Sequence, residues 1–154
     1  MQPLKLIVFT MLIVGSVSVF GQNSSYFENK WYGFYEDYSD VFEGGTYYMT
    51  YEMYDVVYDN VYNTFTATMY GKISIDGYNY GATWKINGSM SADFSVYLNY
   101  NYSISSDQLP SGLYWIYDNL TGTIYENEQH LGYYIIKGGK PGSSCKFEIG
   151  TYPY

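Results

Sequence analysis

The chain of 154 residues contains no arginine, one cysteine (Cys145) and one histidine (His130). Without arginine there is no forked guanidinium group to bind phosphate or carboxylate in a bidentate manner. The formal net charge of −8 also argues against nucleic acid as a partner. Because a single cysteine excludes a disulfide within the chain, a fold outside the cell must depend on its apolar core.

Residues typical of catalytic sites are equally scarce. Cys145 and His130 would form a nucleophilic pair only if the fold brought them together. Cys145 alternates with Phe147 and Ile149 along a predicted strand, which favours a buried thiol that acts as a small apolar side chain. We therefore expect no catalytic residues and no enzymatic activity.

Metal ligands and cofactor motifs are also missing. An acidic run of Glu36, Asp37, Asp40 and Glu43 offers oxygen atoms to Ca²⁺, but its spacing matches no dedicated calcium loop. Such runs are usually solvated, and the 15 acidic residues make some carboxylate pair unavoidable, so a glycosidase pair is not indicated either. We expect neither a metal nor a cofactor.

Only one long apolar run is present, and it lies at the N-terminus. Residues 6–20 are mostly apolar, follow Lys5, and precede a small residue directly before Gln22. The run is shorter than the roughly 20 residues of a membrane-spanning helix, and the pattern is typical of a secretory signal peptide. We expect residues 1–21 to be removed, residues 22–154 to form one domain, and the protein to be secreted or periplasmic.

The sequence is rich in tyrosine, with 23 residues, and its apolar and polar residues alternate over long stretches. Between residues 61 and 75 the apolar side chains fall mainly on odd positions, and between 80 and 100 they fall on even positions. A period of two with one apolar and one polar face is the pattern of antiparallel strands with one buried face.

Two Gly-containing dipeptides predict hairpins. Asp76-Gly77 fits a two-residue type I′ turn that pairs Ile75 with Tyr78 and keeps all apolar residues on one face. At Asn87-Gly88 a two-residue turn would reverse that pattern. There we predict a three-residue loop that pairs Ile86 with Met90, Trp84 with Ala92 and Ala82 with Phe94.

The remaining strands follow from the same alternation. They are expected at residues 31–38, 46–58, 113–117, 120–126, 130–137 and 145–151, with loops at 105–111 and 138–144 and a two-residue turn at Asp118-Asn119. Short strands at regular spacing predict an all-β fold. We expect a single antiparallel, barrel-like domain of eight or nine strands, mostly hairpin-connected.

This arrangement resembles the up-and-down barrels of the lipocalin and avidin (calycin) superfamily. The resemblance rests on four features: the expected signal peptide, the segment NKWYG at residues 29–33, the consecutive hairpins, and the segment LTGTIYENEQHLGYYI at residues 120–135. Trp31 precedes Gly33 here, whereas lipocalins open with Gly-x-Trp. The resemblance implies a ligand-binding barrel, and no family ligand contacts are carried over.

Four asparagines match the Asn-x-Ser/Thr acceptor of N-glycosylation, namely Asn23, Asn87, Asn101 and Asn119. Each falls in a turn, near a terminus or on a predicted outward face. The match has meaning only in a eukaryotic source, and the oligomeric state is left open by the sequence.

Tyrosine is intrinsically favoured in strands, and this preference accounts for most of these residues. Inward aromatics can also line a site for a small apolar ligand, and the candidates for this lining are Trp84, Tyr80, Phe94, Trp115 and Tyr133. Outward tyrosines can instead stack on sugar rings, which makes Tyr70 and Tyr97 candidates for glycan binding.

A third alternative is a small outer-membrane barrel, in which the apolar face would point outward to lipid. The consecutive tight turns argue against it, so a membrane is not the expected partner. Our leading hypothesis is a secreted, non-catalytic protein that binds a small apolar ligand inside its barrel.

Overall fold

The structure is a computed structural model and describes residues 30–37, 47–130, 133–142 and 145–151. The expected signal peptide (residues 1–21) and two members of the acidic run (Asp40 and Glu43) lie outside the described residues. All regular elements in the described part of the chain are strands.

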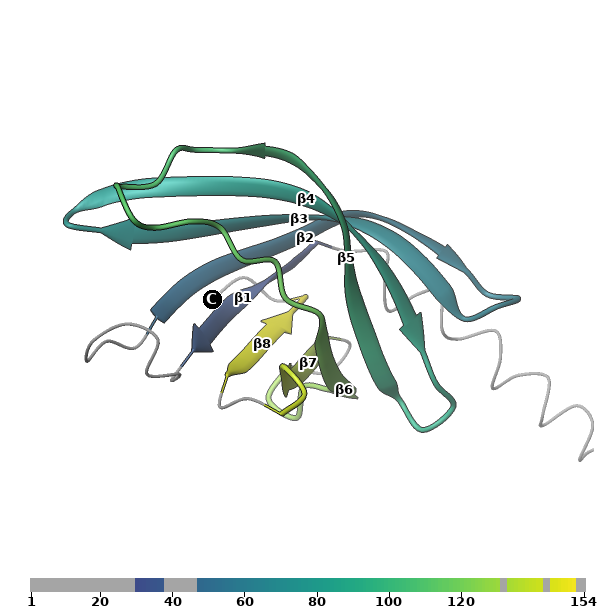
Figure 1. Ribbon diagram of the computed structural model, residues 1–154. Coiled ribbons are helices and arrows are strands. Elements are labelled where there is room, and N and C mark those ends of the chain that lie inside the picture. The colour runs from purple at the N-terminus through teal and green to yellow at the C-terminus, as the bar shows by residue number, and fades with distance from the viewer. Residues whose placement is uncertain (1–29, 38–46, 131–132, 143–144, 152–154) are drawn as a thin grey trace, which may run out of the picture.

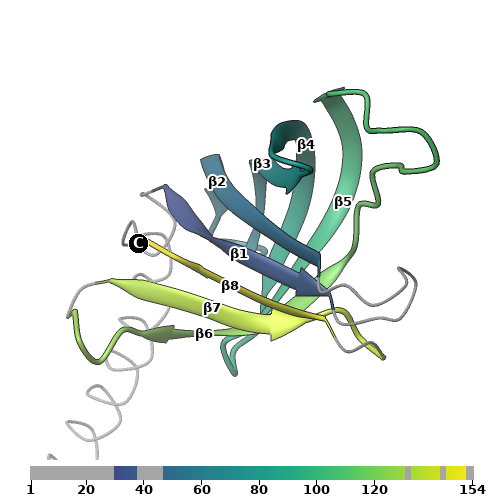
Figure 2. The same ribbon diagram turned by 90° about the vertical axis from the view of Figure 1, so that its left-hand side faces the viewer.

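Eight strands form one closed antiparallel barrel in sequence order, and β8 pairs with β1 (Figures 1 and 2). The strands are β1 (Trp31–Asp37), β2 (Tyr47–Asp59), β3 (Thr64–Ile75), β4 (Tyr78–Met90), β5 (Ser95–Ser106), β6 (Leu120–Glu126), β7 (Tyr134–Gly139) and β8 (Lys146–Gly150). The predicted all-β, barrel-like fold with hairpin connections is confirmed.

The apolar face of every strand points into the barrel. On β3 the odd residues Phe65, Ala67 and Met69 are buried, and on β4 the even residues Trp84 and Ile86 are buried. The outer face of the same strands carries threonine, lysine, asparagine and tyrosine. The predicted two-residue alternation is therefore the alternation between interior and exterior.

The Asp76-Gly77 hairpin is confirmed in turn and register. Ile75 pairs with Tyr78, and Met69 pairs with Trp84. Both turn residues have positive φ, 51° at Asp76 and 82° at Gly77, as a type I′ turn requires.

The predicted loop at Asn87-Gly88 is wrong, because β4 continues through it to Met90. Gly88 faces inward, and a Cβ atom there would collide with the ring of Phe65. This glycine therefore serves close packing inside a strand and not a turn. The chain reverses after Met90, where the Ser91 N–H donates to Ser95 O at 2.9 Å and Met90 pairs with Val96.

The register beyond that turn consequently differs from the predicted one. Ile86 pairs with Tyr100 and Trp84 with Ser103, so neither Met90 nor Ala92 lies opposite them. Phe94 lies in the turn with a φ of 65° and is 45% exposed, which corrects its expected inward position.

A predicted strand at residues 113–117 is also wrong. The chain between β5 and β6 is one irregular connection, residues 107–119, and the predicted loop at 105–111 covers only its first part. β5 pairs with β6 only from Ser95 to Leu98, although β5 runs on to Ser106 beside β4. In Figure 2 this connection spans the side of the barrel between β5 and β6.

The two ends of the barrel are named here after one inward residue each. The Trp31 end is where β1 begins, and it carries the β2–β3, β4–β5 and β6–β7 connections. The Asp118 end carries the Asp76-Gly77 turn, the 107–119 connection and the β7–β8 connection.

Candidate functional site

The Tyr117 side chain of the 107–119 connection packs against the inner wall at the Asp118 end of the barrel. Tyr117 stacks on Tyr100 of β5 with ring centroids 4.7 Å apart and 15° between the planes. Its ring is also 5.3 Å from that of Trp84 on β4. The hydroxyl groups of Tyr117 and Ser103 are within hydrogen-bond distance, at 3.2 Å. These contacts join an irregular segment to the inner wall.

From Trp84 the ring contacts continue across the barrel. Trp84 meets Tyr51 of β2 edge-on at 5.6 Å, and Tyr51 lies 5.8 Å from Tyr35 of β1. We call these five residues the aromatic chain: Tyr35, Tyr51, Trp84, Tyr117 and Tyr100. The first three are buried, with exposed fractions of 6–7%, whereas Tyr117 and Tyr100 are partly exposed.

Gly71 of β3 makes room for this arrangement. It pairs with Tyr51 on one side and Ala82 on the other, and a Cβ atom at this position would lie 2.9 Å from the Trp84 ring and 2.8 Å from the Met49 sulfur. The missing side chain lets the indole of Trp84 lie over the backbone and reach Tyr51. The small residue Gly71 beside these large rings therefore allows the contact between Trp84 and Tyr51.

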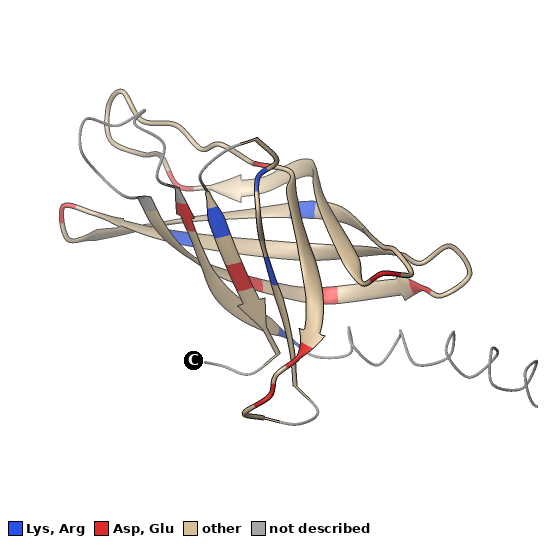
Figure 3. Ribbon diagram, turned by 90° about the horizontal axis from the view of Figure 1, so that it is seen from below, with Lys and Arg blue, Asp and Glu red and all other residues tan. Residues whose placement is uncertain are grey.

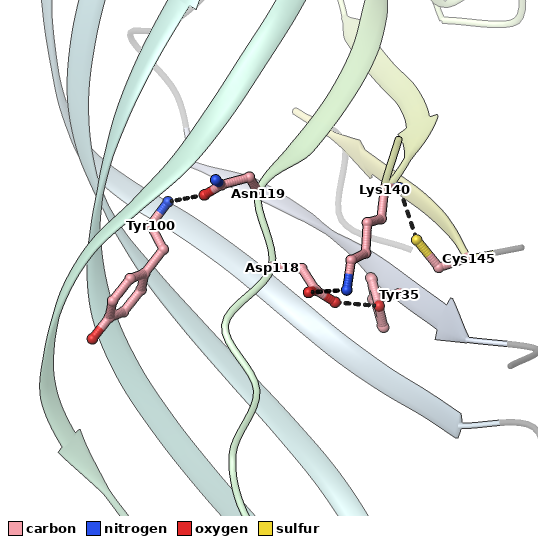
Figure 4. Close-up of polar contacts among 6 residues, drawn as sticks. All are labelled: Tyr35, Tyr100, Asp118, Asn119, Lys140 and Cys145. Atoms are coloured by element: carbon pink, nitrogen blue, oxygen red, sulfur yellow. Dashed lines mark hydrogen bonds and ion pairs between the residues drawn. The ribbon is translucent and has the colours of Figure 1, made fainter. Parts of the chain in front are cut away.

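A polar cluster lies beside the aromatic chain (Figure 4). The Tyr35 hydroxyl donates a hydrogen bond to Asp118 Oδ2 at 2.8 Å, and Lys140 Nζ lies 2.8 Å from Asp118 Oδ1. The backbone N–H of Lys140 donates to Cys145 Sγ at 2.8 Å. The next residue, Asn119, accepts a hydrogen bond from the Tyr100 N–H at 2.9 Å. These contacts join the β5–β6 and β7–β8 connections to each other and to strands β1 and β5.

The cluster keeps two phenols neutral. Burial first, and then the nearby Asp118 carboxylate, raise the pKa of Tyr35 and of Tyr51 well above the ordinary 10.0. Both side chains are therefore hydrogen-bond donors with intact hydroxyl groups at neutral pH. The Asp118 side chain is only 12% exposed, and that of Lys140 is 44% exposed.

The structure places three of the predicted cavity residues at this end. Trp84 is buried within the aromatic chain, Tyr80 is partly buried on the inner face of β4, and Trp115 is partly buried in the 107–119 connection. The indole N–H of Trp115 donates to Asp107 O at 2.9 Å, which folds that connection on itself.

The other two predicted cavity residues lie at the Trp31 end and are exposed. Phe94 is displaced into the β4–β5 turn, as described above. Tyr133 belongs to the β6–β7 connection, is 40% exposed, and meets the His130 ring edge-on at 6.4 Å. The strand predicted from residue 130 begins only at Tyr134, so the predicted alternation did not apply to Tyr133.

The two glycan candidates lie on the outer wall, as predicted for their faces. Tyr97 of β5 is 41% exposed. Tyr70 of β3 is partly buried, because its ring covers Gly81 on the neighbouring strand. Of the pair, Tyr97 presents more of its surface to a partner.

Cys145 and His130 are not brought together. Cys145 is buried next to the start of β8 at the Asp118 end, and His130 is exposed in the connection at the Trp31 end. Among the described residues no group of three or more His, Cys, Asp and Glu side chains is placed to hold a metal ion. The thiol is a packed side chain that accepts the hydrogen bond from Lys140.

Six residues of this site were not among the sequence candidates: Tyr35, Tyr51, Tyr100, Tyr117, Asp118 and Lys140. A signal existed for Tyr35 and Tyr51, since each alternates with buried neighbours on β1 and β2. For Asp118 and Lys140 there was none, because both lie in connections whose course depends on the closed barrel.

Comparison of the chain with protein-family models, with curated proteins and with solved structures found no match. In the residues that the structure describes, no helix has the length and apolar character needed to cross a membrane.

Proposed function

We propose that this protein is a secreted, non-catalytic binding protein that holds a small ligand with a flat apolar body at the Asp118 end of its barrel. The observation that carries the proposal is a set of side chains that pack on the core yet stay partly exposed. At this end the set consists of Ile75, Tyr80, Tyr100, Leu109, Trp115 and Tyr117. Apolar surface that packs on the core and remains in contact with water is what a ligand would cover.

The polar groups at the same end support a ligand of defined orientation. The Ser103 and Tyr117 hydroxyls, together with Asp118 and Lys140, lie within or beside the aromatic surface. A predominantly apolar lining with a few fixed polar groups is the usual character of a small-molecule site. The inward direction of the apolar side chains supports this proposal over an outer-membrane barrel, which requires the opposite orientation.

Fluorescence titration with N-phenyl-1-naphthylamine, a neutral apolar probe, tests the proposal. We expect saturable enhancement of probe emission and energy transfer from tryptophan. The variant Tyr117→Leu removes a stacked ring from the site and should weaken probe binding at least tenfold. The matched control Tyr125→Leu removes an exposed ring from the outer wall and should leave binding unchanged.

Equal binding by the two variants would contradict a site at the Asp118 end. Saturable probe binding that is lost in the Tyr125→Leu control and kept in Tyr117→Leu would move the site to the outer wall.

Glycan binding on the outer wall is the second candidate, and the exposure of Tyr97 favours it. Tyr97 and Tyr125 lie on the neighbouring strands β5 and β6 and are each 41% exposed. Exposed rings on a sheet face can stack on sugars. A glycan array probed with the wild-type protein and with Tyr97→Ala tests this candidate, since the substitution should abolish any glycan signal without affecting stability.

The expected export rests on the sequence of residues 1–21. Sequencing the N-terminus of protein collected from the medium or periplasm should begin at or close to Gln22. Full-length protein retained in the cytosol would contradict this part of the proposal.

A further inference from the structure

We propose that the ligand of the Asp118 end is a small organic cation, an amine whose charge pairs with Asp118 and whose apolar body lies against the aromatic chain. This inference rests on the proposed function and specifies its ligand class. The ammonium group of Lys140 lies 2.8 Å from Asp118 Oδ1, and this is the position that the ammonium group of the ligand would take.

The first step is the placement of Asp118. Its side chain is 12% exposed, and its two oxygens have different partners, the Tyr35 hydroxyl on Oδ2 and the Lys140 ammonium on Oδ1. A carboxylate withdrawn from water needs a compensating positive charge. Oδ2 is held by the barrel wall through β1, so the exchangeable contact is the one at Oδ1.

The second step is the difference between Asp118 and its partner. The Lys140 side chain is 44% exposed and comes from the β7–β8 connection. A lysine ammonium is a compact, strongly hydrated charge on a flexible stem, so it can withdraw into water when another cation arrives. Replacement of one ammonium by another keeps the buried carboxylate neutralised throughout.

The third step concerns the surroundings of the carboxylate. The Tyr35 hydroxyl contacts Asp118, and the Tyr35 ring lies 5.8 Å from that of Tyr51. Trp84 and Tyr117 extend the aromatic surface from there. The faces of phenol and indole rings attract cations, and the attraction is stronger where the cation is withdrawn from water. Burial and the Asp118 charge hold the pKa of Tyr35 and Tyr51 high, so these rings remain neutral phenols.

An anionic ligand held by Lys140 is the competing interpretation, and the charges disfavour it. An anion at Lys140 would have to displace Asp118 and leave that carboxylate without its cation inside the barrel. The chain also carries a net charge of −8 without any arginine, and acidic residues lie in turns and along strands of the barrel (Figure 3). This field attracts cations and repels anions.

The test uses three ligands of one shape and different charge: 1-naphthylmethylamine, 1-naphthalenemethanol and 1-naphthylacetate. Their affinities for the purified protein are measured by isothermal titration calorimetry at neutral pH. We expect the amine to bind at least tenfold more tightly than the alcohol, and the acetate to bind least.

Two substitutions examine the charges directly. Asp118→Asn should reduce amine affinity to that of the alcohol and leave alcohol binding unchanged. Lys140→Gln should raise amine affinity severalfold, because it removes the competing ammonium. The outer-wall ion pair of Lys137 and Glu148 supplies matched controls. Glu148→Gln changes the net charge by the same amount as Asp118→Asn, and Lys137→Gln by the same amount as Lys140→Gln. Both controls should preserve the preference for the amine.

The outcomes separate this inference from the proposed function. Equal, measurable affinity for amine and alcohol overturns the cation inference and leaves a binding site for apolar bodies. Failure of all three ligands and of the neutral naphthylamine probe overturns the proposed function itself. If 1-naphthylacetate binds more tightly than the amine and this binding is lost in Lys140→Gln, the ligand is an anion and the cation inference is wrong. If Asp118→Asn does not fold, an unchanged or lowered amine affinity in Lys140→Gln still overturns the inference.

Discussion

At the Trp31 end of the barrel most inward side chains are almost fully buried, whereas at the Asp118 end several tyrosines and a tryptophan are in partial contact with water. Trp31, Met53, Val96 and Ile136 at or near the first end have exposed fractions of 0%. The second end carries the partly exposed rings and the Asp118–Lys140 ion pair. One end is therefore closely packed, and the other leaves part of its aromatic surface in contact with water.

The difference follows from the lengths of the strands. β6, β7 and β8 have 7, 6 and 5 residues, whereas β2 and β4 have 13 each. Because these strands are short, β5 pairs only with β4 beyond Leu98, and the 107–119 connection occupies its other side (Figures 1 and 2). An irregular segment packs less completely than a strand, so the interior near it stays partly wet.

The comparison is tested most severely by Trp31→Ala. Truncation of this fully buried indole should lower the free energy of unfolding by about 3–5 kcal/mol, through lost transfer energy and a residual cavity. The corresponding change at the other end, Trp115→Ala, should stay within about 1–2 kcal/mol because the ring is already partly exposed. Urea unfolding followed by circular dichroism measures both, and equal losses would mean that the two ends are packed alike.

Gly71→Ala should disturb the Asp118 end from within. The added methyl group would collide with the Trp84 ring and the Met49 sulfur, which predicts a loss of about 1–3 kcal/mol by overpacking. Because Trp84 must move, probe binding should weaken as well. Gly88→Ala is the matched change elsewhere in the core, where it displaces the Phe65 ring. It should destabilise the fold without altering the ligand preference of the protein that remains folded.

Alkaline pH should act through the two buried phenols. Tyr35 and Tyr51 keep their protons in the folded protein well above the ordinary pKa of 10.0, whereas the unfolded chain releases them near that value. Stability is therefore complete below about pH 10 and falls above it, by up to about 1.4 kcal/mol per pH unit for each group. Unfolding free energies between pH 8 and 11 should show a shallower decline in Tyr51→Phe than in the wild type. An identical decline would exclude Tyr51 as a source.

Tyr117→Leu should have the smallest effect on stability and the clearest effect on the site. The ring is partly exposed, and its stacking on Tyr100 contributes about 0.5–1.5 kcal/mol. We expect a loss near 1 kcal/mol in urea unfolding together with the weakened probe binding described above. A loss as large as that of Trp31→Ala would show that the connection is part of the core.

Some features of the fold could be predicted from local sequence because each depends on neighbouring residues only. The Asp76-Gly77 turn needs positive φ at two consecutive residues, and its register follows from the alternation on both sides. The predicted loop at Asn87-Gly88 is wrong because glycine is favoured both in tight turns and where a neighbouring side chain packs closely against the backbone. Here it accommodates the Phe65 ring from the adjacent strand, a contact that no local pattern reveals.

The alternation of apolar and polar residues by itself determined that this chain forms antiparallel strands, one face of which is buried, because the side chains of a strand point to opposite sides in turn. Only the tertiary structure decided which connections enter the interior. Tyr117 and Asp118 meet strands β1, β4 and β5 through contacts between residues far apart in sequence, such as the hydrogen bond from Tyr35 to Asp118, and Lys140 pairs with Asp118. Such contacts depend on the closure of the barrel and on unequal strand lengths. The alternation within a single segment predicts neither of these features.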